Sequence, residues 1–288
     1  MLVTKFYVKK DERALLLRRG DFVKVLGAGE YVYFDPLKRL TVEKFSLAKT
    51  AFDHKLAEYL VKTEPEVVAR EFTAVELSAT QIALRYENGV LVEVLAPNTR
   101  RLYWKGYIDV EFETIDIATD FAIAPALVPR IAALILRGGI KIAGNEGVFV
   151  ALVPEHSAGL LYVDGKLQQG LLASGLHYFW RYLRDVKVDT VDLRLQVLDV
   201  AGQEILTKDK VSLRVNLTAG YRYTDVQTAF AKQAKPTEFL YKELQFGLRA
   251  AVGTRSLDEL LENKSIIDDV VSEHIKRRVS GYGLEVES

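Results

Sequence analysis

The sequence contains no cysteine and carries no net charge. Among its 288 residues, 39 Lys and Arg balance 39 Asp and Glu. The missing cysteine excludes disulfide bonds, thiol catalysis and zinc sites with cysteine ligands, and it favours a reducing compartment without requiring one. The balanced charge leaves no basic footprint, so we expect no nucleic-acid partner. It also leaves little long-range repulsion between copies of the chain.

The sequence also lacks a long hydrophobic run. No stretch reaches the roughly 18–20 apolar residues that a membrane-spanning helix needs, and residues 1–10 do not form a signal peptide. The nearest approach is residues 121–136 (FAIAPALVPRIAALIL), which Pro125, Pro129 and Arg130 interrupt. We therefore expect this segment not to span a membrane.

Catalytic and metal-binding motifs are absent as well. The four histidines lie far apart in the sequence and show no metal-ligand spacing, so we predict no metal site. No dinucleotide fingerprint, phosphate-binding loop or nucleophile elbow occurs. We therefore predict no catalytic residue, no cofactor and no enzymatic activity. The histidines are His54, His156, His177 and His274.

A repeated pattern organises residues 1–192. Residues 89–116 match residues 165–192 without a gap, at a constant offset of 76 (165 − 89). A third copy lies upstream, around residues 19–47. Each copy has an apolar strand, a glycine turn, a second strand, an aromatic pair and an alternating strand, which predicts a duplicated antiparallel β unit. The leading strands are expected at residues 14–17, 81–84 and 148–153.

Two further segments have a clear period. Residues 52–71 are expected to be helical, with Pro65 dividing them near the centre. Residues 211–223 alternate between apolar and polar side chains. That alternation is typical of a long strand with one buried face and one face in water.

The C-terminus changes to a helical period. A helix is expected from Pro236 to Gly253, a second from the capping box that begins at Ser256, and a third from Ser265. Residues 282–287 (YGLEVE) are expected to form a short edge strand. Strands followed by helices predict the α+β class: tandem small antiparallel β units, then an α+β domain with C-terminal helices.

Several C-terminal stretches carry a family resemblance. They are residues 191–194 (VDLR), 203–211 (QEILTKDKV), 221–225 (YRYTD), 253–261 (GTRSLDELL) and 282–286 (YGLEV). These stretches are similar to the band 7 (SPFH) domain of the stomatin, prohibitin and flotillin superfamily. The second and fourth resemble the slipin branch in particular, and the duplicated β units resemble those of bacterial slipins.

The resemblance implies a non-enzymatic scaffold that assembles with itself into rings or cages. It further implies regulation of membrane proteins at a membrane surface, beside an NfeD-type membrane protein or a membrane protease. We expect a cytoplasmic location, peripheral to the inner membrane. Family members carry an N-terminal membrane hairpin, which is not found here, and continue into a long C-terminal helix, so we expect the natural chain to be longer.

Two other functions stay open at this point. One is a monomeric adaptor that binds a membrane protease or channel through the N-terminal β units. The other is an enzyme with a pocket between those units. The expected division of the chain is an N-terminal module of two β units with a helical stretch between them (1–120), an apolar linker or short helix (121–140) and the band 7 domain (141–288).

Charged residues of the C-terminal part have two interpretations. Residues 207–210 (TKDK), with Glu204, either form an exposed turn, where ion pairs contribute little, or form contacts between copies, where alternating signs set the register. Arg255 and Asp258 either serve helix capping and solvation or take part in the same contact. The candidates for the oligomer contact are Arg194, Glu204, Lys208, Asp209, Lys210, Arg255 and Asp258.

Residues 121–136 also have two interpretations. They form either a shallow re-entrant membrane loop or an interdomain linker. In the linker, Pro129 opens a short helix from Arg130 to Arg137 and Gly138 ends it. The two arginines favour the linker, since in a membrane they would have to stay near the headgroups. The candidates for membrane or interdomain contact are Phe121, Ile123, Leu127, Ile131, Leu134 and Ile135.

Overall fold

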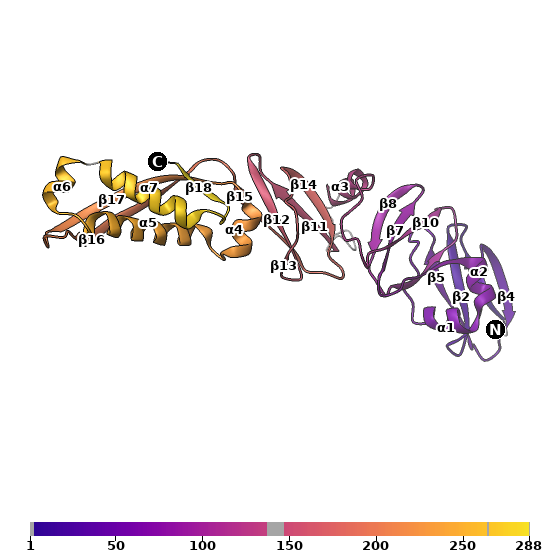
Figure 1. Ribbon diagram of the computed structural model, residues 1–288. Coiled ribbons are helices and arrows are strands. Elements are labelled where there is room, and N and C mark those ends of the chain that lie inside the picture. The colour runs from indigo at the N-terminus through magenta and orange to yellow at the C-terminus, as the bar shows by residue number, and fades with distance from the viewer. Residues whose placement is uncertain (1–2, 137–146, 264, 288) are drawn as a thin grey trace. The chain divides into compact units, whose positions relative to one another are not determined.

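The first five strands form two small antiparallel sheets. In the computed structural model, which describes residues 3–136, 147–263 and 265–287, β1 pairs with β4, and β2 lies between β3 and β5 (Figure 1). Strand β2 is buried on both faces, because Ala14 and Leu16 join one core while Leu15 and Leu17 join another. The strands are β1 (Val3–Val8), β2 (Glu12–Arg18), β3 (Asp21–Leu26), β4 (Gly29–Phe34) and β5 (Leu40–Ser46).

The next five strands have the same order. Strand β6 pairs with β9, and β7 lies between β8 and β10. Asn88 (φ 49°) and Gly89 (φ 76°) form the turn between β7 and β8, and this left-handed pair is the geometry that a two-residue hairpin loop requires. The strands are β6 (Phe72–Glu76), β7 (Gln81–Glu87), β8 (Val90–Leu95), β9 (Arg100–Trp104) and β10 (Val110–Asp116).

The third set of five strands has this order again. Strand β11 pairs with β14, and β12 lies between β13 and β15. The β12–β15 register begins with Ser157 opposite Asp192, and the β7–β10 register has Gln81 opposite Asp116, both numbers being 76 lower. The strands are β11 (Val148–Val153), β12 (Ser157–Val163), β13 (Lys166–Leu167), β14 (Gly175–Trp180) and β15 (Val186–Asp192).

One sequence prediction about this third set is wrong. Residues 148–153 do form a strand, β11, but the strand that enters the turn at Gly165 is β12. The error has a simple cause. Strand β12 begins with Ser157, Ala158 and Gly159, whose small side chains are not typical of a strand, whereas β11 is almost entirely apolar.

The β6–β9 sheet packs against the β3-β2-β5 sheet. Its Phe72, Leu102 and Trp104 share a core with Leu15 and Leu17 of β2. The ring centroids of Phe72 and Trp104 lie 4.2 Å apart. The three-stranded sheet of the first set is therefore covered by the two-stranded sheet of the second.

Two short helices, α1 (Ala57–Thr63) and α2 (Pro65–Glu71), lie beside this core. The prediction of a helical stretch divided at Pro65 is confirmed. The first helix begins later than expected, because Phe52 belongs to the core and its N–H donates to the carbonyl of Leu102 (2.9 Å).

The β11–β14 sheet continues the same layering. Its Val148, Tyr178 and Trp180 share a core with Ile82 and Leu84 of β7. The opposite face of β7 carries the buried Ala83, which packs with the β6–β9 sheet in a separate core. The three-stranded sheet of the second set is thus covered on both sides.

The C-terminal part contains one longer sheet. Strand β17 (Ser212–Tyr223) lies between β16 (Gln196–Leu206) and β18 (Leu284–Glu287). Strand β16 bulges between Val200 and Gln203, where Gly202 adopts φ 66°. The predicted long alternating strand and closing edge strand are both confirmed.

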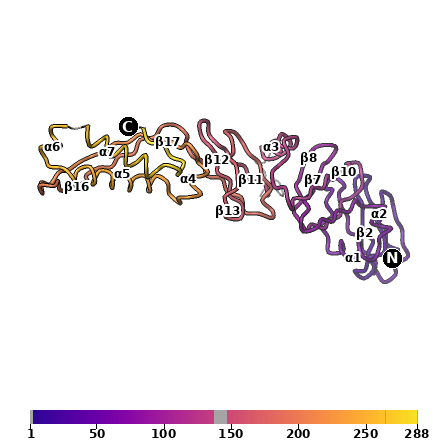
Figure 2. Tube along the Cα trace, viewed as in Figure 1, coloured from indigo at the N-terminus to yellow at the C-terminus, as the bar shows by residue number. Residues whose placement is uncertain are grey.

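Four helices accompany this sheet: α4 (Val226–Lys232), α5 (Pro236–Gly253), α6 (Leu257–Glu262) and α7 (Ser265–Val279). Helices α5 and α7 run side by side along it (Figures 1 and 2). The predicted helices after Pro236, Ser256 and Ser265 are confirmed, and α6 begins with the predicted capping box. In that box, Ser256 N–H donates to the Glu259 carboxylate (2.8 Å). Helix α4 was not predicted.

The chain divides into two compact units. Unit 1 comprises Met1–Phe149 and Tyr178–Arg184, and unit 2 comprises Val150–His177 and Asp185–Ser288. The α+β class, with small antiparallel sheets followed by C-terminal helices, is confirmed. Among the described residues, no helix combines the length and the apolar character needed to cross a membrane.

Candidate interaction surface

The turn between β16 and β17 is stabilised by its own side chains. Thr207 is buried, and its hydroxyl accepts a hydrogen bond from Val211 N–H (3.0 Å) and donates one to Asp209 Oδ1 (2.5 Å). The Thr207 N–H donates to the Val211 carbonyl (2.9 Å). Lys210 takes a left-handed conformation, with φ 65°. These bonds define a single conformation for a turn made mainly of charged residues.

The same turn is hydrogen-bonded to the junction of α5 and α6. Lys208 N–H donates to the carbonyl of Arg255 (2.8 Å), and Leu257 N–H donates to Asp209 Oδ1 (3.2 Å). The Thr207 hydroxyl, supported by this amide, lowers the pKa of Asp209 below its ordinary value. Arg255 in turn donates to the carbonyl of Ala251 at the end of α5 (3.0 Å). Asp209 and Arg255 therefore position the turn.

Other side chains of this region point to solvent. Leu206 is 59% exposed and Leu261 is 61% exposed, although both are large and apolar. Lys208 and Lys210 from the turn and Asp258 from α6 are exposed as well. We call this group the tip surface, and it consists of Leu206, Lys208, Lys210, Asp258 and Leu261. Exposed leucines between charges of both signs are typical of a protein contact surface.

The structure brings most of the predicted oligomer-contact residues together. Lys208, Asp209, Lys210, Arg255 and Asp258 all lie at the tip, and the exposed Glu204 lies beside it, near the end of β16.

Arg194 is separate from this group. It precedes β16, and that strand of 11 residues places it roughly 35 Å from Lys208. It donates from its backbone N–H (2.9 Å) and its Nε (3.0 Å) to Asp192, and these bonds lower the pKa of Asp192 to about 2.

Sequence reasoning missed three residues of this site. Thr207 was considered only as part of a charged turn, yet it is the buried residue that the turn is built around. Leu206 and Leu261 were not singled out. Leu206 could have been identified by parity, since its neighbour Ile205 is buried and successive strand residues face opposite sides.

The apolar segment forms the helix α3 (Val128–Leu136) and its approach. Ile123, Ile131 and Leu134 are buried in the core of unit 1. Leu127 and Ile135 pack against the same core, and Phe121 stacks on Phe179 with centroids 5.9 Å apart. Most of the apolar area of this segment is therefore buried within unit 1. The predicted helix end at Arg137 and Gly138 lies outside the described residues.

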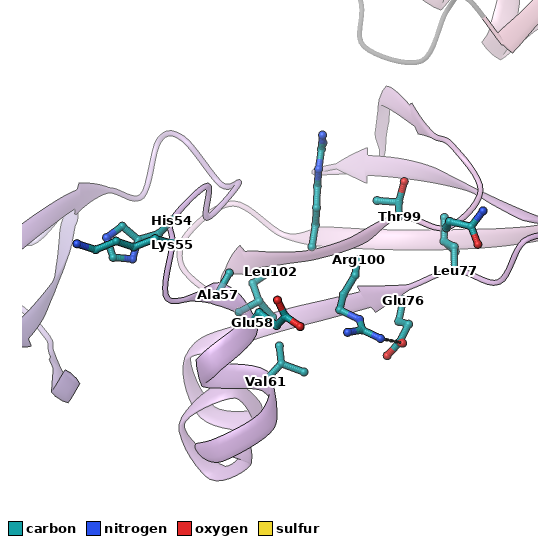
Figure 3. Close-up of a pocket in the computed structure, with 12 residues that line it drawn as sticks. His54, Lys55, Ala57, Glu58, Val61, Glu76, Leu77, Thr99, Arg100 and Leu102 are labelled. Atoms are coloured by element: carbon teal, nitrogen blue, oxygen red, sulfur yellow. Dashed lines mark hydrogen bonds and ion pairs between the residues drawn. The ribbon is translucent and has the colours of Figure 1, made fainter. Parts of the chain in front are cut away.

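A cleft of about 650 Å³ lies in unit 1 beside α1 (Figure 3). Its wall comes from α1 and from strands β6 and β9. Its arginines and glutamates are engaged in ion pairs: Arg100 with Glu76, Arg101 with Glu93, and Glu58 with Lys62. His54 at its edge lies 2.8 Å from Glu43. The geometry indicates structural ion pairs rather than a nucleophile with its base.

The other histidines also have ordinary partners. His274 Nε2 lies 3.2 Å from Glu243, and His177 Nε2 lies 2.7 Å from the carbonyl of Ala173. His156 is an exposed turn residue beside Glu155. Across the described ranges, no three histidine, aspartate or glutamate side chains gather closely enough to hold a metal ion.

Comparison with known proteins identifies relatives of the C-terminal half. The sequence model described as "SPFH domain / Band 7 family" matches residues 151–288. An uncharacterized protein of Methanocaldococcus jannaschii is 30% identical over 138 residues, which are 48% of this chain and 68% of that protein. A stomatin homolog of Pyrococcus horikoshii is 29% identical over 137 residues, 48% of this chain and 50% of the homolog.

Mouse stomatin is a further relative. It is 26% identical over 140 residues, which are 49% of each chain. The chain thus spans about half the length of the two stomatin relatives. The match to the family model begins at residue 151, so it leaves out Met1–Phe149 of unit 1.

Proposed function

Since the chain belongs to the SPFH domain/band 7 family, we propose that it is a non-enzymatic scaffold that assembles with itself at a membrane surface. The observation that carries the proposal is the tip surface. The backbone of its turn is hydrogen-bonded within the turn and to the junction of α5 and α6, so little backbone ordering is needed on binding.

The chemistry of the tip surface suits contact between identical copies. Lys208 and Lys210 provide positive charge, Asp258 provides negative charge, and Leu206 and Leu261 provide apolar area. Neighbouring copies can pair opposite charges around the leucines, which sets their register. Many such contacts, each weak, close a ring or a cage.

The polar character of the cleft in unit 1 supports the absence of catalysis. Its arginines are matched with glutamates, and its histidine is paired with Glu43. We extend the proposal to the partners of the assembly and to its cellular location. The assembly organises or regulates membrane proteins, among them an NfeD-type membrane protein or a membrane protease, from the cytoplasmic side of the inner membrane.

We also propose a finer classification. The residues 203–211 and 253–261 favour the slipin branch, and the duplicated β units favour a bacterial source. The shared strand order and the 76-residue offset between β7–β10 and β12–β15 support a duplicated β unit.

Reversing the charge of the turn tests the scaffold proposal. In mass photometry across concentration, the wild-type chain is expected to form large particles of one size. The variant Lys208→Glu/Lys210→Glu is expected to shift them to small species. A matched control, Lys166→Glu/Lys276→Glu, changes the same number of exposed lysines elsewhere in unit 2 and is expected to assemble normally.

The second candidate function, a monomeric adaptor, predicts a different result. Wild type would then stay monomeric at every concentration, and both double variants would match it. That outcome contradicts the scaffold and directs attention to binding by the N-terminal β units.

A further inference from the structure

The outer face of each two-stranded sheet carries three equivalent positions. In the first set, Val3 lies opposite Phe34, and in the second, Phe72 lies opposite Trp104. The third position lies two residues before Phe34 in β4 and two residues before Trp104 in β9. The equivalent sets are Val3, Val32 and Phe34; Phe72, Leu102 and Trp104; and Val148, Tyr178 and Trp180.

Burial separates the first set from the other two. Leu102 and Trp104 are each 2% exposed, because the β3-β2-β5 sheet covers them. Trp180 is equally buried against the β10-β7-β8 sheet. In contrast, Val32 is 59% exposed and Phe34 is 73% exposed. The first sheet thus presents to solvent the positions that are core in the two sheets built like it.

We call this surface the open face. Side chains alternate along a strand, so the outward residues are every second one of β1 and β4. They are Val3, Lys5, Tyr7, Glu30, Val32 and Phe34, all of them exposed. Four of the six carry large apolar groups. A contiguous apolar patch of this kind is a recognised mark of an interaction site.

We propose that the same open face of a second copy of this chain covers it, forming a twofold dimer. The three-stranded sheets, which cover the equivalent faces in the other two sets, are already packed against other parts of the chain. Strands β2 and β7 are buried on both sides in the described residues. Strand β12 packs through Leu160 into the core of unit 2. A second copy therefore offers its own open face as the matching apolar sheet surface.

The charges on the open face favour this occupant and select its geometry. Lys5 lies opposite Val32, and Glu30 lies opposite Tyr7, so one cation and one anion occupy the face. A twofold axis parallel to the strands places Lys5 over Val32 of the second copy, beside its Glu30. Sheets that stack face to face lie about 10 Å apart, a gap that the lysine and glutamate side chains can span together. The face is therefore complementary to itself in charge.

A single introduced cysteine tests the contact, since the natural chain has none. Val32 lies in the middle row of the face, so Val32→Cys in the full chain is expected to form covalent dimers with a short bismaleimide. Val23→Cys is the matched control, because Val23 is also an exposed strand valine of unit 1, on β3. Cross-linking of Val32→Cys no greater than that of Val23→Cys would overturn the proposal.

Complementary charges provide a second test that a folding defect cannot imitate. By sedimentation velocity, Lys5→Glu and Glu30→Lys are each expected to lose the dimer contact, because each brings like charges together across the axis. An equimolar mixture of the two is expected to restore it. No change in the single variants, or no recovery in the mixture, contradicts the proposal.

The open-face contact is separate from the tip surface, and the experiment keeps them apart. In the Lys208→Glu/Lys210→Glu background, the open face is expected to leave a dimer that Lys5→Glu converts to a monomer, a twofold change in mass. A dimer there with no larger wild-type particles would support the open face while the scaffold proposal fails. Large wild-type particles that Val32→Cys does not cross-link would support the scaffold while the open-face dimer fails.

Discussion

Units 1 and 2 bury their apolar side chains in different ways. Unit 1 divides its buried side chains among four separate clusters, each between a two-stranded and a three-stranded sheet or within one strand set. Unit 2 gathers most of its own into one cluster, formed by the long sheet, its helices and residues of β12 and β15. The difference shows that thin layers need many interfaces, whereas one long sheet with helices needs a single one.

Buried charge differs in the same way. Between the layers of unit 1, Glu93 accepts from Arg85 (2.7 Å) and Arg101 (3.0 Å), and Arg85 lies over the ring of Tyr103. These groups link neighbouring strands of the second set to each other. In unit 2 the buried carboxylate of Glu243 on α5 instead links two helices, through His274 and Arg278 of α7. Polar contacts therefore join strands in one unit and helices in the other.

The largest effect is expected from a cavity in the single core of unit 2. Leu248 of α5 is fully buried. Its replacement, Leu248→Ala, is expected to cost about 2–5 kcal/mol of unfolding free energy. Circular dichroism at 222 nm reads this loss, since the long helices α5 and α7 belong to unit 2.

Tryptophan fluorescence follows the unfolding of unit 1, as circular dichroism follows that of unit 2. Both tryptophans of the chain, Trp104 and Trp180, lie in that unit. Leu102→Ala is expected to shift the fluorescence transition while the transition at 222 nm stays in place, and Leu248→Ala is expected to do the opposite. If either variant shifts both signals equally, the two units unfold together and the contrast between them fails.

A smaller effect is expected from a glycine that joins two elements of unit 2. Gly283 adopts φ 70°, and an added Cβ would lie 2.0 Å from the carbonyl oxygen of Asp225. Gly283→Ala is therefore expected to cost more than the roughly 1–2 kcal/mol of a left-handed conformation alone, because strand β18 must shift from α4.

Gly281→Ala is the matched control for this substitution. Gly281 has a similar φ of 79°, and an added Cβ would meet only the end of the Lys232 side chain, at 3.9 Å. Chemical denaturation followed at 222 nm measures both variants. Equal losses of unfolding free energy in the two variants would show that the overlap with Asp225 is relieved at no energetic cost.

The smallest effect is expected from the buried carboxylate of Glu243. Burial raises the pKa of Glu243, but hydrogen bonds from Arg278 and His274 outweigh it and lower the pKa below its ordinary value. Glu243→Gln is therefore expected to cost about 1–3 kcal/mol at pH 7.

The pH dependence of this effect follows from the lowered pKa. The stabilisation is fully present above the unfolded pKa of about 4.3 and is lost as the pH falls through the lower, folded value. Unfolding of wild type and variant at pH 7 and at pH 3 is expected to show the difference shrinking in acid. A difference independent of pH would assign the effect to packing.

The sequence predicted the elements with strong periods or specific end signals. Residues 211–223 alternate without interruption, and the capping box at Ser256 and Glu259 is formed as expected. Helix α4 was missed because it has only seven residues and is held by its N-cap Asp225 and by burial of Val226 and Ala229. A helix that short has no period to detect and depends on tertiary packing.

The sequence predicted the charged residues of the tip surface, but it did not predict the role of Asp209 or the exposed leucines. Charged letters mark an exposed turn, so Lys208 and Lys210 could be selected from the sequence. The role of Asp209 could not, because its partner Leu257 lies 48 residues away. Exposed leucines are equally hard to predict, since an apolar residue is expected inside until the parity of its strand or the face of its helix is known.

The layered strand sets of unit 1 have a consequence for how such a chain can change during evolution. The faces centred on Trp104 and Trp180 occupy equivalent positions and meet equivalent three-stranded sheets. Recombination that adds or removes one whole set would therefore bring together the same kinds of surface. Length becomes a quantity that natural selection can adjust in discrete steps, while each step keeps the chemistry of the interface that it copies.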